Sequence, residues 1–128
     1  MPRKVPSRAR SYRVRPVELK AKITLSRGGF VTLGPGKIEL LERIERMGSI
    51  AAAARGMRMS YRQAWLLIRR LNATAKEPLV SASVGGAGGG GATVTSMGRD
   101  VLKEYRALQK EIETVLRRRR ASLRKILH

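Results

Sequence analysis

Residues 33–72 read LGPGKIELLERIERMGSIAAAARGMRMSYRQAWLLIRRLN, and this stretch decides the predicted fold. Three segments with apolar residues at helical spacing run through it, separated at Gly48 and Gly56. The first segment begins at Pro35, which favours a helix start, and ends at Gly48, which favours a helix end. The stretch therefore begins with a predicted amphipathic helix.

The next two predicted helices begin at serine caps. Ser49 precedes a short segment built almost entirely from alanine, which lets a neighbouring helix approach closely. Ser60, with Gln63 three residues later, matches a capping box for a third helix that ends before Pro78. The pattern predicts three consecutive helices joined by short turns.

A β-hairpin is predicted before these helices. Apolar and polar residues alternate over 17–25, Gly28 and Gly29 form a turn, and residues 30–33 form a short returning strand. Residues 1–16 hold several prolines and basic side chains, which predicts a disordered arm.

A second hairpin and a long helix follow the third helix. Strands are predicted over 79–84 and 92–94, around glycine-rich residues 85–91, and the helix begins after Thr95. Apolar residues of that helix recur at spacings of four and three, which predicts a seam that packs against a second copy, or alternatively against the chain's own domain. The predicted dimer interface comprises Val101, Tyr105, Leu108, Ile112 and Val115.

This order of elements predicts an α+β fold that is mainly α. It is a winged helix-turn-helix with an N-terminal β-hairpin and a long C-terminal dimerisation helix. The expected domains are a basic arm (1–16), the winged helix-turn-helix domain (17–94) and the long helix with its basic C-terminal end (95–128).

Composition favours an anionic partner. The net charge is +19, there is no cysteine, and one histidine stands at position 128. A charge of this size favours nucleic acid as the partner. The chain offers no set of residues for catalysis, a metal or a cofactor, so none of these is expected. It also lacks an apolar run for a membrane span, which predicts a cytoplasmic, nucleoid-associated protein.

The first turn of the third helix carries the candidate DNA contacts. Arg62 can pair with guanine and Gln63 with adenine, whereas Ser60 and Tyr61 hydroxyls can contact phosphates. Whether Arg62 contacts bases or phosphates stays open, and Gln63 could instead serve only the capping box. The glycine-rich segment is interpreted as a wing tip whose backbone amides approach phosphate, or as a passive loop. The predicted DNA-binding residues are Ser49, Ser60, Tyr61, Arg62, Gln63, Arg69, Arg70, Gly86, Gly88 and Gly89.

Four motifs occur in one order: GSI-x-x-AAR, MSYR-x-AW, EPLV and a glycine-rich segment followed by T-x-x-G. The stretch from Leu33 to Tyr105 resembles the N-terminal DNA-binding domain of the molybdate-responsive regulator family (ModE). The resemblance implies a LysR-like winged helix, a dimerising helix and regulation at palindromic operators. By motif, it carries a DNA-facing role to Ser49 and to residues 60–63.

The resemblance also implies a ligand that we do not expect here. Family members bind molybdate through C-terminal domains, and nothing in the sequence after the basic helix matches them. We therefore expect double-stranded DNA and a second copy as partners, with no membrane and no molybdate site in this chain. The run Arg117–Arg120 is either a solvated charged face or a nucleic-acid contact.

Two functions fit these observations. The first is a sequence-specific, double-stranded DNA-binding transcription regulator that acts as a homodimer. The alternative is an architectural protein that coats DNA with little sequence preference, which the high positive charge favours. Specificity for one duplex sequence discriminates between them.

Overall fold

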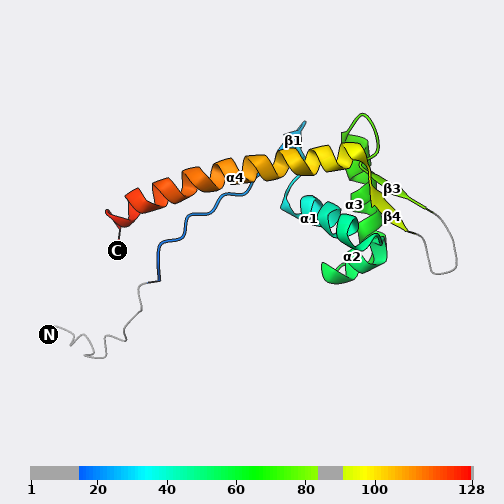
Figure 1. Cartoon of the computed structure of the whole chain (residues 1–128), viewed down its shortest axis with the longest axis horizontal. Coiled ribbons are helices and arrows are strands. Elements are labelled where there is room, and N and C mark those ends of the chain that lie inside the picture. The colour runs from blue at the N-terminus through cyan, green and yellow to red at the C-terminus, as the bar shows by residue number, and fades with distance from the viewer. Residues whose placement is uncertain (1–14, 84–90, 128) are drawn as a thin grey trace, which may run out of the picture. The chain divides into compact units, whose positions relative to one another are not determined.

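The computed structural model describes residues 15–83 and 91–127, and helices dominate this part of the chain (Figure 1). The elements follow in the order β1 (Leu25–Arg27), β2 (Phe30–Leu33), α1 (Pro35–Met47), α2 (Ile50–Gly56), α3 (Tyr61–Thr74), β3 (Val80–Ala82), β4 (Ala92–Val94) and α4 (Ser96–Arg124). Contacts divide the chain into one unit over Lys22–Lys110 and another that joins the residues up to Ala21 with those from Glu111 onward. The predicted domain bounds stay a prediction.

Helix α1 begins and ends as its sequence predicts. Pro35 occupies the first turn after an extended Gly34, and Gly48 takes a left-handed φ of 64°. The Gly48 N–H donates to the Ile44 carbonyl over 2.8 Å, which closes the last turn. The apolar face of the helix enters the core through Ile38, Leu40, Leu41 and Ile44.

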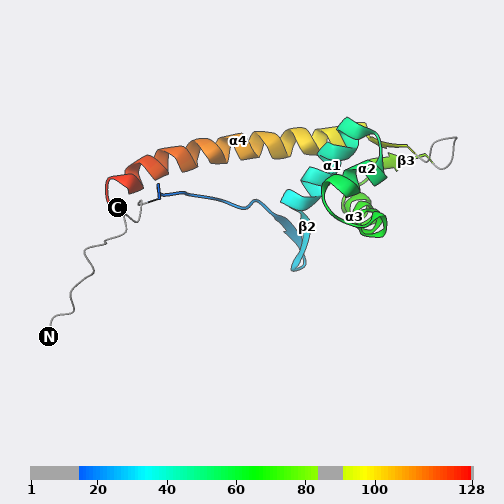
Figure 2. The ribbon, with the colours of Figure 1, turned by 90° about the horizontal axis from the view of Figure 1, so that it is seen from below.

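Helix α2 packs against both α1 and α3, as Figure 2 shows from below. Its alanines explain the close fit, because Ala53 is fully buried and Ala54 is 2% exposed. Helix α3 adds Ala64, Ile68 and Leu71 to the same core. The three predicted helices are therefore present, although α3 ends at Thr74, earlier than the expected end at Glu77 and Pro78.

Two small antiparallel hairpins flank the helices. Strand β1 pairs with β2 across a turn in which Gly28 and Gly29 have positive φ angles of 58° and 83°. The strand predicted over 17–25 is wrong, since only Leu25 of that range is in a strand. Its alternation lacks a pairing partner, because β2 spans just four residues.

Strands β3 and β4 pair from Val80 with Val94 to Ala82 with Ala92. The strand predicted over 79–84 is therefore shorter, and Leu79 is buried just before it. The Ala92 N–H donates to the Gly48 carbonyl over 3.0 Å, which attaches β4 to the junction of α1 and α2.

Thr95 joins the start of α4 to the start of β3. Its hydroxyl donates to the Pro78 carbonyl over 2.7 Å and accepts from the Gly98 N–H over 3.1 Å. Its own N–H donates to the Leu79 carbonyl over 3.0 Å. Gly98 lies so close to the Leu79 carbonyl and the Val94 side chain that a Cβ would overlap with both. The T-x-x-G motif thus combines a helix cap with a close backbone approach.

The predicted fold class needs correction. The structure supports a mainly helical chain with two separate two-stranded antiparallel sheets. A winged helix-turn-helix with a dimerisation helix is not supported by these findings. The expected wing tip lies outside the described residues, and the first turns of α4 bury Leu102 and Tyr105 in the core of their own unit. We therefore describe the fold by its elements.

None of the helices in the described part of the chain is long and apolar enough to span a membrane.

Candidate functional site

The start of α3 is fixed by a complete capping box. The Ser60 hydroxyl accepts from the Gln63 N–H over 3.1 Å, and the Gln63 side-chain oxygen accepts from the Ser60 N–H over 3.0 Å. Both residues are exposed, as a DNA contact requires, but their side chains already serve the helix. The capping box predicted from the sequence is confirmed.

Tyr61 and Arg62 project from this first turn. Tyr61 is 53% exposed and meets the edge of Trp65, with ring centroids 6.1 Å apart and planes at 84°. Trp65 is half-buried and packs against the core. Arg62 is exposed and forms no ion pair or hydrogen bond with another described residue, so its guanidinium can engage a ligand.

Helix α3 carries a basic surface that we call the α3 outer face, made of Arg62, Leu66, Arg69 and Arg70. All four side chains are exposed, and residues three and four apart in a helix lie on one side. Helix α3 contains no acidic residue. Its arginines make no ion pair within the described ranges, so their positive charge is not neutralised locally.

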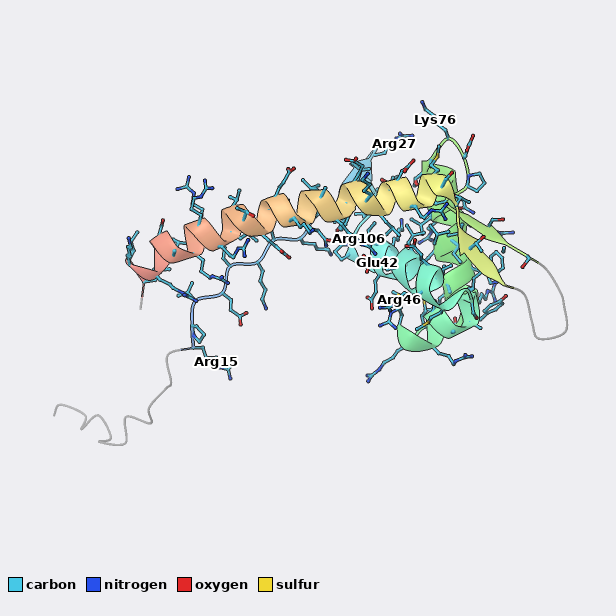
Figure 3. The ribbon with its side chains drawn as sticks, viewed as in Figure 1. Arg15, Arg27, Glu42, Arg46, Lys76 and Arg106 are labelled. Carbon is cyan, nitrogen blue, oxygen red and sulfur yellow. The ribbon has the colours of Figure 1, made fainter. Side chains whose placement is uncertain are left out.

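On α1, in contrast to α3, acidic side chains form ion pairs with arginines. Glu39 pairs with Arg43 over 3.0 Å, and Glu42 pairs with Arg106 of α4 over 3.3 Å. Figure 3 shows Arg106 and Glu42 pointing toward one another from their two helices. These pairs leave α1 close to neutral and concentrate unpaired positive charge on α3.

The other predicted contact on this side, Ser49, serves as the cap of α2. Its hydroxyl accepts from the Ala52 N–H over 3.1 Å, and the residue is half-buried. Gly86, Gly88 and Gly89 lie outside the described residues. At the edge of that segment, the Ser83 N–H donates to the Gly91 carbonyl over 2.8 Å.

Sequence reasoning missed the turn between α2 and α3. Arg58 is exposed and has a φ of 54°, a left-handed conformation that non-glycine residues rarely adopt. Arg55, at the end of α2, is exposed as well. The only signal in the sequence was the basic character of this turn, since nothing there predicts a left-handed arginine.

A pocket of about 300 Å³ lies between β2, the start of α1 and the turn before α3. Its lining is mostly apolar and includes Met57, Met59 and Leu67. Lys37 borders it and donates to the carbonyls of Val31 and Thr32, each over 3.1 Å. Burial, together with the charge of Arg70, lowers the pKa of Lys37.

Some residues of the predicted dimer seam are buried in the core of their own unit, whereas others are exposed to solvent. Tyr105 is 5% exposed, and its hydroxyl donates to the Ile23 carbonyl over 2.9 Å. Val101 is half-buried against the same core, whereas Leu108 is 42% exposed. In the other unit, Ile112 is half-buried and Val115 is 51% exposed. Tyr105 therefore packs within its own domain.

Arg117–Arg120 also lies in that other unit. Arg117 donates to the Thr114 hydroxyl over 3.5 Å, and Arg120 is half-buried while its three neighbours are exposed. No group of three or more His, Cys, Asp or Glu side chains gathers within residues 15–83 and 91–127. The expectations of no enzyme, metal or cofactor remain predictions.

Comparison with known proteins places the chain near regulators and molybdenum proteins. It is 42% identical over 98 residues to the "Molybdenum transport protein ModE" of Azotobacter vinelandii, covering 77% of this chain and 36% of that protein. It is 41% identical over 91 residues to the "Molybdenum-pterin-binding protein MopA" of Rhodobacter capsulatus, covering 71% and 34%. Both of these relatives are named for molybdenum.

A third relative is the "DNA-binding transcriptional dual regulator ModE" of Escherichia coli K12, 38% identical over 71 residues. That match covers 56% of this chain and 27% of the regulator. The matches cover between 27% and 36% of the length of these three relatives. No model of a protein family matches the chain.

These relatives correct two expectations. The sequence motifs predict that this chain resembles the DNA-binding domain alone of the regulator family. However, MopA and MopB, which also match this chain, are named as molybdenum-pterin-binding proteins. The matches do not show that the shared region is a DNA-binding domain, so that restriction is wrong. The exclusion of a molybdate site is wrong as well, because it conflicts with relatives named for molybdenum.

Proposed function

We propose that the Lys22–Lys110 unit binds double-stranded DNA with sequence preference, as part of a transcription regulator. The observation that carries this proposal is the α3 outer face, on which three arginines lie exposed and pair with no acidic residue of the described ranges. The capping box holds the first turn of α3 in one conformation, so Arg62 is presented from a fixed backbone. Similarity to proteins named as transcriptional regulators supports the regulatory role.

The residues of α3 would have different roles in a DNA complex. Arg62 can donate two parallel hydrogen bonds to guanine O6 and N7, a contact that discriminates by about 1–3 kcal/mol. Arg69 and Arg70 would contact phosphates, which add affinity without sequence information. Ser60 and Gln63 are occupied by the capping box, so they contribute mainly by fixing the helix start.

Selection of bound duplexes from a random pool, at about 150 mM salt where non-specific binding is weak, tests the proposal. We expect a defined sequence to be recovered. Arg62→Ala should then weaken binding to that duplex by about 10- to 100-fold and change random duplex binding much less. Arg46→Ala is the matched control, because it removes one exposed arginine from α1 (Figure 3).

The opposite result supports the architectural alternative. Recovery of no defined sequence, with Arg62→Ala and Arg46→Ala weakening binding equally, would indicate attraction by the net charge of +19 alone. Sequence-specific binding by α3 would then be abandoned.

A regulator that recognises a palindromic site is expected to act as a homodimer. The exposed Leu108 and Val115 support this part of the proposal, since both are large apolar side chains on α4. Sedimentation equilibrium of the wild-type chain should give twice the 14.2 kDa monomer mass. Recovery of an inverted repeat in the duplex selection would agree, and a monomer bound to a single half-site would contradict it.

The names of MopA and MopB favour a second candidate function, the binding of a molybdenum-containing ligand. Isothermal titration with molybdate tests it directly, with sulfate as the control oxyanion. Saturable heat with molybdate, absent with sulfate, would support this candidate. Equal or absent heat with both oxyanions would count against direct molybdate binding by this chain.

A further inference from the structure

Leu66 occupies an unusual place on helix α3. Single exposed leucines are common on protein surfaces, but Leu66 is 46% exposed within the basic α3 outer face. Arg62 lies four residues before it, and Arg69 and Arg70 lie three and four residues after it. Its side chain therefore shares one side of the helix with three guanidinium groups.

The core does not account for this leucine. Ala64, Ile68 and Leu71 supply the buried side of α3, and Leu67 is half-buried against the same core. Leu66 points away from them, where a lysine or glutamate would be better solvated. A large apolar side chain here suits a ligand that presents an apolar group among anionic or polar ones.

DNA presents such a group in its major groove. Each base pair offers hydrogen-bond donors and acceptors there, and the C5-methyl of thymine is the apolar exception. Arginine matches the phosphates and guanine, whereas leucine can match only the methyl group. The composition of the α3 outer face thus corresponds to the composition of a major groove that contains thymine.

Helix geometry also fixes where the methyl group should lie. Four residues of an α-helix rise about 6 Å, which separates Arg62 from Leu66 along the α3 axis. A helix in the major groove is inclined to the DNA axis, and helix positions about three residues apart contact successive bases, so the two side chains would reach neighbouring base pairs.

We propose that Leu66 is a specificity residue that contacts a thymine methyl group about one base pair from the guanine read by Arg62. This inference rests on the proposed DNA binding by α3, and it assigns a base preference to a residue that sequence reasoning did not single out. Its strength should match the burial of about one methyl group, which corresponds to about a fourfold change in affinity.

Replacing thymine by uracil, one position at a time, removes only the methyl group from the selected duplex. Fluorescence anisotropy should show one replacement that weakens wild-type binding about fourfold. Leu66→Ala should bind the original duplex more weakly by a similar factor and be insensitive to that replacement. Leu66→Met should retain sensitivity to uracil, because it keeps an apolar side chain at this position.

Leu25→Ala is the matched control, since Leu25 is a 62% exposed leucine on β1. It should keep the uracil sensitivity of the wild-type chain, and circular dichroism should show that every variant remains folded. If no replacement weakens wild-type binding, or if Leu66→Ala stays sensitive, the role of Leu66 is disproved. Sequence-specific binding that still depends on Arg62 would leave the proposed function standing. If the wild-type chain shows no sequence preference at all, both the role of Leu66 and the proposed sequence-specific function are disproved.

Discussion

Asn72 shows how much a single half-buried amide can organise. Its side-chain oxygen accepts from the backbone N–H groups of Leu79 and Val80, over 2.9 and 3.0 Å. Its side-chain nitrogen donates to the Val80 carbonyl over 3.2 Å. One side chain thus attaches the last turns of α3 to the first residue of β3.

Replacement of this amide should destabilise the fold. Asn72→Ala leaves two N–H groups without a partner, and each unsatisfied buried group costs about 1–3 kcal/mol. We expect the free energy of unfolding, measured by urea denaturation, to fall by at least the cost of one such group. Asn72→Asp is the control, because it keeps an accepting oxygen and should lose less. Equal stability of wild-type and Asn72→Ala protein would contradict this role.

At the scale of elements, the sequence predicted helices far better than strands. Helices α1 to α4 have local signals, namely apolar periodicity, Pro35, and the serine and threonine caps. The alternation over 17–25 was misleading, because a strand also needs a neighbour with which to pair. The roles of Asn72 and Gly98 depend on groups distant in the chain and were not predictable from local pattern.

The candidate site followed the same rule. The exposure of Arg62 could be inferred from its place beside the cap, and the structure agrees. The sequence could not show which apolar residues of α4 face the domain's own core and which face outward. The same spacing suits packing against a second chain and packing against that core. The spacing predicts a dimer contact for Tyr105, whereas its hydroxyl donates to the Ile23 carbonyl in the segment that leads into β1.

Tyr105 should give the α4 contact a dependence on pH. Burial raises the pKa of its hydroxyl above the ordinary value of 10.0. The folded state therefore holds this proton more tightly than the unfolded state. The contribution is fully present below about pH 10 and is lost as pH rises through the folded pKa.

Tyr105→Phe isolates that contribution from titrating lysines. At pH 8 the variant should be less stable by about 0.5–1.5 kcal/mol, because the hydrogen bond to Ile23 is absent. Above about pH 10 the difference from wild type should shrink, since only the wild-type chain loses the tyrosine contribution. Urea denaturation at several pH values measures the difference, and a constant gap up to pH 11 would exclude the effect.

At the scale of the whole molecule, like charges dominate. The chain carries a net charge of +19, and described acidic groups pair with basic ones at Glu18–Lys20, Glu39–Arg43 and Glu42–Arg106. Exposed pairs of this kind stabilise a protein by about 0–1 kcal/mol each, so they offset little of the repulsion. A polyanion or dissolved salt should stabilise the folded chain by screening this charge.

This repulsion predicts a melting temperature that rises with salt. The Debye screening length falls from about 30 Å at 0.01 M to about 8 Å at 0.15 M ionic strength. Charges that lie farther apart than this length then repel one another much less. Differential scanning calorimetry in sodium chloride should show the rise over this range. The uncharged solute sucrose at equal osmolality controls for solvent effects. A melting temperature that is flat or falls with salt would show that the charges are already compensated.

At Arg58, the left-handed backbone lowers the stability of the fold, whereas its exposed positive charge should favour DNA binding. Glycine adopts this conformation without strain, so Arg58→Gly should raise the free energy of unfolding by up to about 1 kcal/mol. The same change removes a positive charge beside α3 and should weaken DNA binding, whereas Arg58→Lys should preserve it. Parallel denaturation and anisotropy titrations compare the two effects, and a variant that gains in both would refute the trade-off. A laboratory that evolved this chain for heat resistance alone would thus be expected to lose its affinity first at this turn.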